Sequence, residues 1–66
     1  MFEMSLALNN DVFVNPNGEF DQIYGGYEVA AILRKVANQI QNGSVNGKCM
    51  DSNGNGVGSW RITERR

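Results

Sequence analysis

Six apolar residues follow the period of an α-helix in the middle of this 66-residue chain. They lie three or four positions apart, so they share one face of a helix. Glu28 at the start suits the positive end of the helix dipole, and Asn42-Gly43 is a typical helix stop. The pattern predicts a helix over residues 26–42, with a stripe that a second layer must cover: Val29, Ile32, Leu33, Val36, Ala37 and Ile40.

Strand patterns occur in the sequence both before and after this helix. Residues 2–8 alternate large apolar and other side chains, as in a strand with one buried face. Residues 45–63 contain two strand-like runs around Asn53-Gly54, which favours a hairpin with both turn residues at positive φ. That turn sets Asp51 opposite Gly56, with Cys49 opposite Gly58 and Gly47 opposite Trp60.

Because side chains alternate between the faces of a strand, this register divides the hairpin residues into two sets. The set expected to face the helix is Val45, Gly47, Cys49, Gly58, Trp60 and Ile62, with glycines leaving room for the indole. The set expected to face outward is Lys48, Met50, Val57, Ser59, Arg61 and Thr63.

A chain of 66 residues can hold only one small core. We therefore expect a single α+β domain over residues 1–66, in which one helix packs on three strands connected β-α-β-β. Antiparallel pairing of the first strand with the last gives the order first, third, second, and a parallel crossover is the alternative. Open sheet edges in so small a domain favour self-association as a dimer.

The chain offers little catalytic chemistry. It contains no histidine, which is the commonest general base and metal ligand, and its one cysteine, Cys49, is expected to face inward as an inert thiol. We expect no enzyme and no cofactor. The apolar runs are too short to span a membrane, and the lone cysteine and the absence of a secretory pattern favour the cytoplasm.

Residues 51–56 read DSNGNG, like the start of an EF-hand calcium loop. The twelfth position of that loop, which needs a bidentate glutamate, is Ile62 here, and the flanking segments are strands where the motif needs helices. We therefore expect a hairpin turn at Asp51 and no metal site.

Charge is distributed unevenly along the chain. Residues 1–33 contain five acidic residues and no basic one, whereas residues 34–66 contain six basic and two acidic residues. The long connection over residues 9–26 interleaves acids with aromatic rings, and long loops in compact domains are often binding loops. The residues expected to bind a partner are Asp11, Phe13, Glu19, Phe20, Asp21, Tyr24 and Tyr27. Some of these rings must cap the core, and Tyr24 or Tyr27 is expected to stay available.

A basic surface on the outer hairpin face is the alternative binding region. It would consist of Lys48, Arg61, Arg65 and Arg66, and it would contact the phosphates of a nucleic acid. A sequence pI near 5.1 and the lack of an exposed aromatic ring on that face argue against this alternative.

The segment from Tyr27 to Ile62 resembles a group of short β-α-β-β proteins from phages, prophages and related mobile elements. The likeness includes the hairpin signature D-x-N-G-N-x-V-G-x-W. It is carried by Glu28, Val29, Leu33, Arg34, Val36, Ala37, Ile40, Gly43, Gly47, Asp51, Asn53, Gly54, Asn55, Val57, Gly58 and Trp60. The resemblance implies a fold and a phage-type genetic setting, with no assigned activity, and it does not extend to residues 9–26.

Together these features favour a small phage-encoded inhibitor that binds a host protein, such as a nucleic-acid-handling defence component of the kind that anti-CRISPR proteins block. A nucleic-acid-binding accessory protein and a protein that sequesters a small nucleotide ligand are the alternatives.

Overall fold

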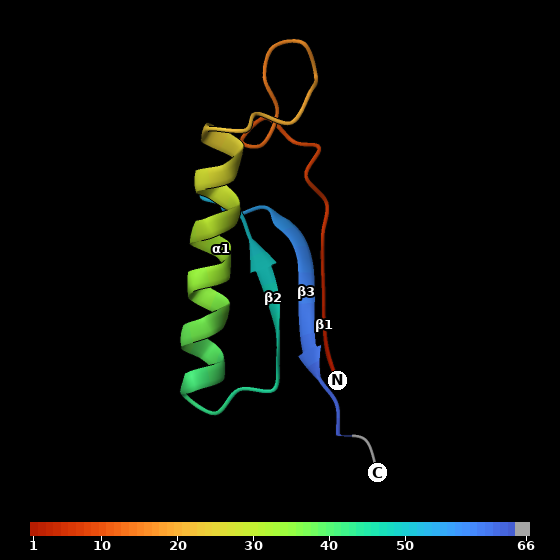
Figure 1. Cartoon of the computed structure of the whole chain (residues 1–66), viewed down its shortest axis with the longest axis vertical. Coiled ribbons are helices and arrows are strands. Elements are labelled where there is room, and N and C mark those ends of the chain that lie inside the picture. The colour runs from red at the N-terminus through yellow and green to blue at the C-terminus, as the bar shows by residue number, and fades with distance from the viewer. Residues whose placement is uncertain (65–66) are drawn as a thin grey trace.

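The computed structural model describes residues 1–64, so Arg65 and Arg66 of the expected basic surface lie outside the described residues. One helix and three strands follow in the order β1 (Phe2–Leu6), α1 (Tyr24–Gln41), β2 (Asn46–Met50) and β3 (Gly56–Ile62) (Figure 1). The strands form one antiparallel sheet with the order β1-β3-β2. The α+β architecture and the antiparallel strand order predicted from the sequence are confirmed.

The sheet places Trp60 at its centre. Trp60 lies opposite Met4 of β1 and Gly47 of β2, and Cys49 lies opposite Gly58, as the sequence predicted for the hairpin. A Cβ on Gly47 would lie 2.7 Å from the Trp60 Nε1 atom, so a glycine is needed to admit the indole.

The core lies between α1 and the inner face of the sheet. Its buried members are Phe13, Ile32, Val36, Cys49, Val57 and Trp60. The indole N–H of Trp60 donates a hydrogen bond of 3.0 Å to the Gln39 side-chain oxygen, which satisfies its only polar atom. The expectation that Trp60 is buried beneath the helix is confirmed.

The helix begins two residues earlier and ends one residue earlier than predicted. Gly43 follows it at a φ of +100° and so supplies the expected left-handed stop. The interpretation of Glu28 was wrong, because no acidic residue lies in the first turn of α1. The Glu28 carboxylate instead accepts a hydrogen bond of 2.6 Å from the Ser52 backbone N–H, which joins the helix to the hairpin turn.

Only part of the predicted apolar stripe is covered. Ile32 and Val36 are buried and Val29 packs beside them, but Leu33, Ala37 and Ile40 are exposed. The reason is that α1 packs mainly along one strand, β2, of a narrow sheet, so part of the stripe is left uncovered.

The hairpin turn differs from the predicted type. Gly54 has a φ of +83°, but Asn53 does not have a positive φ, so the turn is not type I′. Ser52, Asn53 and Gly54 form a three-residue loop, closed by hydrogen bonds from Gly54 N to Asp51 O and from Asp51 N to Asn55 O. This loop takes one more residue from the β2 side than the predicted two-residue turn, so Met50, in place of Asp51, lies opposite Gly56.

The shift of one residue is compensated by a β-bulge between the Cys49 and Met50 pairings. The bulge adds Val57 to β3 as an extra residue, which turns its side chain to the inner face. Val57 is buried, so its predicted position on the outer face was wrong. Val45 and Ile62 have the expected register position but stay exposed, because they lie at the end of the sheet beyond the core.

Among residues 1–64, no helix is both long and apolar enough to cross a membrane.

Candidate functional site

Residues 9–26 fold into an ordered projection above the sheet, at one end of the molecule (Figure 1). Its tip is a turn in which the Asn15 side-chain oxygen accepts hydrogen bonds from the backbone N–H groups of Asn17 and Glu19, at 3.0 and 3.1 Å. Gly18 adopts a φ of +81°, and Val14 pairs with Phe20 in an isolated antiparallel bridge. The segment therefore has defined geometry from which side chains can project.

Phe13 anchors this projection to the rest of the molecule. Its side chain is fully buried, so it belongs to the core and cannot contact a partner, contrary to the prediction. Its backbone oxygen accepts a hydrogen bond of 2.8 Å from Asp21 N–H. A Cβ on Gly25 would lie 2.6 Å from that same oxygen, so the glycine allows the chain to pack tightly against the helix start.

Asp21 is used at the entrance to the helix. One carboxylate oxygen accepts hydrogen bonds of 2.9 Å from the backbone N–H groups of both Ile23 and Tyr24. These N–H groups would otherwise lack partners, as they do at every helix start. Asp21 was predicted as a partner-binding residue, and the structure gives it a positioning role beside the exposed residues that follow it.

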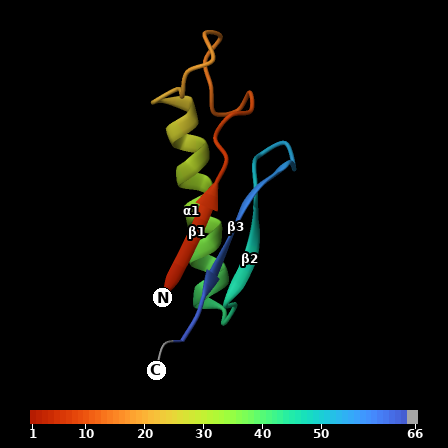
Figure 2. The same ribbon diagram turned by 90° about the vertical axis from the view of Figure 1, so that its right-hand side faces the viewer.

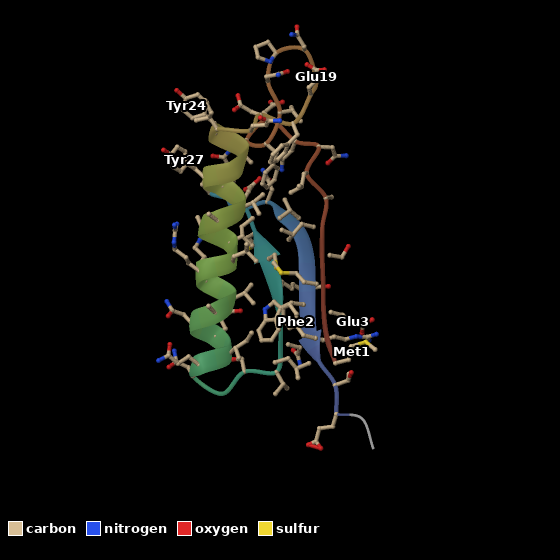
Figure 3. All side chains as sticks on the ribbon, in the orientation of Figure 1. Met1, Phe2, Glu3, Glu19, Tyr24 and Tyr27 are labelled. Carbon is tan, nitrogen blue, oxygen red and sulfur yellow. The ribbon has the colours of Figure 1, made fainter. Side chains whose placement is uncertain are left out.

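Four large side chains remain exposed on either side of Asp21 in the sequence. The exposed fractions are 42% for Phe20, 66% for Ile23, 73% for Tyr24 and 70% for Tyr27. Figure 3 shows both tyrosines projecting from the helix on the side away from the sheet, at the same end of the molecule as Glu19. We call Glu19, Phe20, Ile23, Tyr24 and Tyr27 the contact surface.

A shallow hollow of about 430 Å³ adjoins the contact surface. Its lining brings together three of the predicted residues, Glu19, Phe20 and Asp21, with Ile23. Tyr24 and Tyr27 lie beside this lining on the first turns of α1. Asp11 is exposed in the same segment but does not line the hollow.

Ile23 was not predicted as a site residue. Its position outside the helical stripe and four residues before Tyr27 indicates an exposed face that it shares with that ring. The sequence contains this spacing, but the spacing predicts a shared exposed face only if the helix is known to begin at Tyr24.

The alternative basic surface is weakened by an ion pair. Arg61 Nε lies 2.8 Å from a Glu3 carboxylate oxygen across the outer face of the sheet, and both side chains are largely exposed. Glu3 thus places a negative charge beside the arginine, which leaves Lys48 as the only unpaired cation of this predicted surface among residues 1–64. A phosphate backbone needs a more continuous positive surface than this.

The Asp51 carboxylate is the centre of the hairpin turn. One oxygen accepts hydrogen bonds of 2.9 Å from the N–H groups of Asn53 and Asn55, and the other accepts them from the Asn10 and Asn55 side chains at 2.7 and 3.3 Å. Burial raises the pKa of Asp51, but the hydrogen bonds from Asn55, Asn10 and Asn53 outweigh it and hold the pKa below its ordinary value.

This arrangement explains the calcium-like sequence without a cation. Both carboxylate oxygens face N–H donors, whose positive ends occupy the directions from which a cation would approach. Among residues 1–64, no three acidic, cysteine or histidine side chains lie together as a metal site. The segment DSNGN therefore forms a turn, and Asp51 attaches this turn to Asn10 through a hydrogen bond.

Cys49 offers no nucleophile at the surface. It is buried beneath α1, and burial raises the pKa of its thiol, so the reactive thiolate is disfavoured.

Comparisons with protein-family models, with curated proteins and with solved structures give no match to this chain.

Proposed function

We propose that this protein binds a basic partner protein through the contact surface and inhibits it by occupying its surface. The observation that carries the proposal is the run of four large apolar side chains, Phe20, Ile23, Tyr24 and Tyr27, left 42–73% exposed within eight residues. Clustered exposed apolar groups of this size are uncommon on small proteins that have no partner.

The contact surface is also rigidly supported, which favours binding. The Asp21 hydrogen bonds fix the first residues of α1, and the buried Phe13 holds the preceding segment against Gly25. A partner would then not have to order a mobile loop, so less conformational entropy is lost on binding. Tyrosine is enriched among residues that dominate interface energies because it buries a large ring with few rotatable bonds.

Charge supports a basic partner. Asp11 and Glu19 are exposed at this end of the molecule, and the cations Arg34, Lys35 and Lys48 lie further along α1 and on β2. Acidic groups around aromatic anchors steer a positively charged protein toward the surface and disfavour an acidic one.

The resemblance of residues 27–62 to short phage-type proteins supports a host protein as the partner. A nucleic-acid-handling defence component, of the kind that anti-CRISPR proteins block, has the positive surface that the acidic end would complement. Inhibition by occupancy requires no catalytic group.

Affinity purification from a bacterial host lysate tests this proposal. The wild-type protein is expected to recover a stoichiometric basic partner, and the double variant Y24A/Y27A is expected to lose it. Truncating one central interface tyrosine typically weakens binding by tenfold or more, so two should abolish recovery.

Asn38→Ala is the matched control, because it changes an exposed residue of the same helix outside the contact surface. Circular dichroism should show unchanged helix content in both variants, since all three side chains are exposed. Equal recovery by the wild type and Y24A/Y27A, or recovery of no partner by the wild type, contradicts the proposal.

A further inference from the structure

Among residues 1–64, no strand pairs with the outer edge of β1. In the order β1-β3-β2, β1 pairs with a strand on one side only, and α1 lies behind the sheet in Figure 2, not in line with its strands. Met1 and Thr63 exchange both backbone hydrogen bonds, and Ala7 N–H donates to Val57 O. Because an antiparallel ladder alternates, the odd residues of β1 bond to β3, and Phe2, Met4 and Leu6 direct their N–H and C=O groups to the free edge.

This edge carries little of the protection that usually prevents strand pairing. Natural edge strands often contain proline, lysine or a bulge, and β1 has none of these over Phe2–Leu6. Its one charged residue, Glu3, points to the outer face and is paired with Arg61.

An exposed apolar surface adjoins the edge on the inner face of the sheet. Phe2, Ile62 and Val45 form a row across the end of the three strands, with exposed fractions of 50%, 36% and 56%. Phe2 lies between the sheet and α1, and its ring centre is 6.2 Å from that of Trp60 (Figure 3).

The helix contributes the other side of this surface. Lys35 lines a hollow with Lys48 on the β2 side, and Leu33 and Ile40 lie on the opposite flank of α1, toward β1. Both are exposed, at 48% and 36%. The sheet end and the helix flank thus contribute five apolar side chains, Phe2, Val45, Ile62, Leu33 and Ile40. Two copies that meet through these side chains would not bury like charges.

We propose that a second copy of this chain pairs its β1 antiparallel to β1, on a two-fold axis that passes beside Met4. Only the even residues direct backbone groups outward, so they must form the hydrogen-bonded pairs. Centring the pairing on Met4 uses the whole strand: Phe2 lies opposite Leu6 of the second copy, and Met4 lies opposite Met4.

This register also suits the charges. Glu3 lies opposite Ser5 of the second copy, so the two glutamates do not face each other. The two sheets join into one of six strands, and both helices lie on the same face, since the axis is perpendicular to the sheet. The inner-face residues Phe2 and Leu6 of each copy then cover each other.

The pairing is expected to be reversible. A standard interface removes about 800 Å² from each partner, roughly one-sixth of the 5022 Å² surface of this protein. A five-residue strand and a few half-exposed apolar groups fall below that area, so association should depend on concentration.

Amide hydrogen exchange, followed by NMR across a concentration series, tests the register. Glu3 and Ser5 amides bond to β3 and should be protected at every concentration. Phe2, Met4 and Leu6 amides should exchange rapidly in dilute protein and become protected, in proportion to the dimer fraction from sedimentation analysis. Dimer formation without this protection contradicts the pairing, as does a monomer at all concentrations up to about 1 mM.

A charge change at position 5 gives an independent test in the full chain. Ser5→Glu places a carboxylate opposite Glu3 of the second copy, twice in the symmetric dimer, and should raise the dimer dissociation constant by about 2- to 30-fold. Ser5→Lys should lower it by a similar factor. Both effects should shrink in about 1 M salt, because exposed charges are screened.

Ser59→Glu is the matched control, because it adds the same charge to the same exposed face one strand further from the axis. It should change the dissociation constant less than Ser5→Glu does. Equal effects of Ser5→Glu, Ser5→Lys and Ser59→Glu overturn the proposed register. These tests involve neither Tyr24 nor Tyr27, so they can fail without affecting the proposed contact surface.

Discussion

At the residue scale, the same five-residue turn occurs twice in this chain. In NPNGE and DSNGN, the first side-chain oxygen accepts N–H groups from the third and fifth residues, and the glycine adopts a positive φ. Asn15 needs one acceptor atom for this purpose. Asp51 needs two, because its second oxygen accepts the Asn10 and Asn55 side chains. This difference explains why an aspartate is used in the hairpin and an asparagine suffices in the projection.

Asp51 should therefore make stability depend on pH in the acid range. Its pKa in the folded protein lies below the ordinary value of 3.8, so its contribution is complete above that value and is lost as pH falls through the lower folded pKa. Asp51→Asn should be less stable than wild type near neutral pH, and the difference should shrink as pH decreases below about 4. Urea unfolding from about pH 7 to about pH 3 measures this difference.

Asp11→Asn is the control for this experiment, because it removes an exposed carboxylate from the same end of the molecule. Its difference from wild type should stay within about 0.5 kcal/mol at every pH. A difference between wild type and Asp51→Asn that stays constant down to the acid limit would show that the charge of Asp51 is not what stabilises the turn.

Gly58 is needed for the close approach of β1 to β3. A Cβ at this position would lie 1.8 Å from the Ser5 backbone oxygen, which cannot move without breaking the ladder. Gly58→Ala should reduce the free energy of unfolding by about 3 kcal/mol or more. Gly56→Ala is the matched control in the same strand, since nothing lies within 4 Å of its Cβ, and it should cost less than about 1 kcal/mol in urea unfolding. Similar losses for both variants would contradict this explanation.

At the element scale, the sequence predicted the features that follow a regular period. The two-residue alternation gave the correct partners for Cys49 and Trp60, and the helical period gave α1 to within two residues. The predicted turn type and the predicted outward position of Val57 were wrong for a common reason. The three-residue loop shifts the pairing by one residue, and the one-residue bulge shifts it back. The register beyond the bulge is therefore unchanged, and the alternation of apolar residues in the sequence reveals neither feature.

The candidate site was predicted less completely, because its geometry depends on contacts distant in sequence. Tyr24 or Tyr27 was expected to remain available, and both are exposed. Phe13 and Phe20 both lie beside Gly25, Phe13 through its backbone oxygen and Phe20 through its ring, yet only the Phe13 side chain belongs to the core. No local pattern distinguishes these two rings.

The start of α1 should depend on Asp21. Asp21→Ala removes the acceptor for the Ile23 and Tyr24 N–H groups and should lower the free energy of unfolding by about 1 kcal/mol. Asp21→Asn keeps an acceptor oxygen and should retain most of that stability. Thermal unfolding of the two variants checks that Asp21→Ala is less stable than Asp21→Asn. Equal losses would indicate that the negative charge matters more than the hydrogen bonds.

At the scale of the whole molecule, the chain is elongated, with extents of 45 × 21 × 18 Å. Its Cα radius of gyration is 13.0 Å, against about 11 Å for a compact domain of this length. The projection over residues 9–26 accounts for the extra length, and the Asn10–Asp51 hydrogen bond ties it to the hairpin. The contact surface lies at one end of the long axis, and Met1, Phe2 and Glu3 lie toward the other (Figure 3).

This shape makes the proposed dimer recognisable in solution. The strands run along the long axis, so a two-fold axis perpendicular to the sheet reverses one copy, and the two projections must point in opposite directions (Figure 1). Small-angle X-ray scattering should give a maximum dimension near 45 Å in dilute protein and a clearly larger one in concentrated protein. Ser5→Glu, measured at the same high concentration, should shift the distance distribution back toward the monomer. Because Met1, Phe2 and Glu3 lie toward the end opposite the projection, an axis beside Met4 leaves the two projections at the outer ends of the dimer (Figure 3). A dimer that keeps the monomer's length would therefore contradict a pairing centred on Met4.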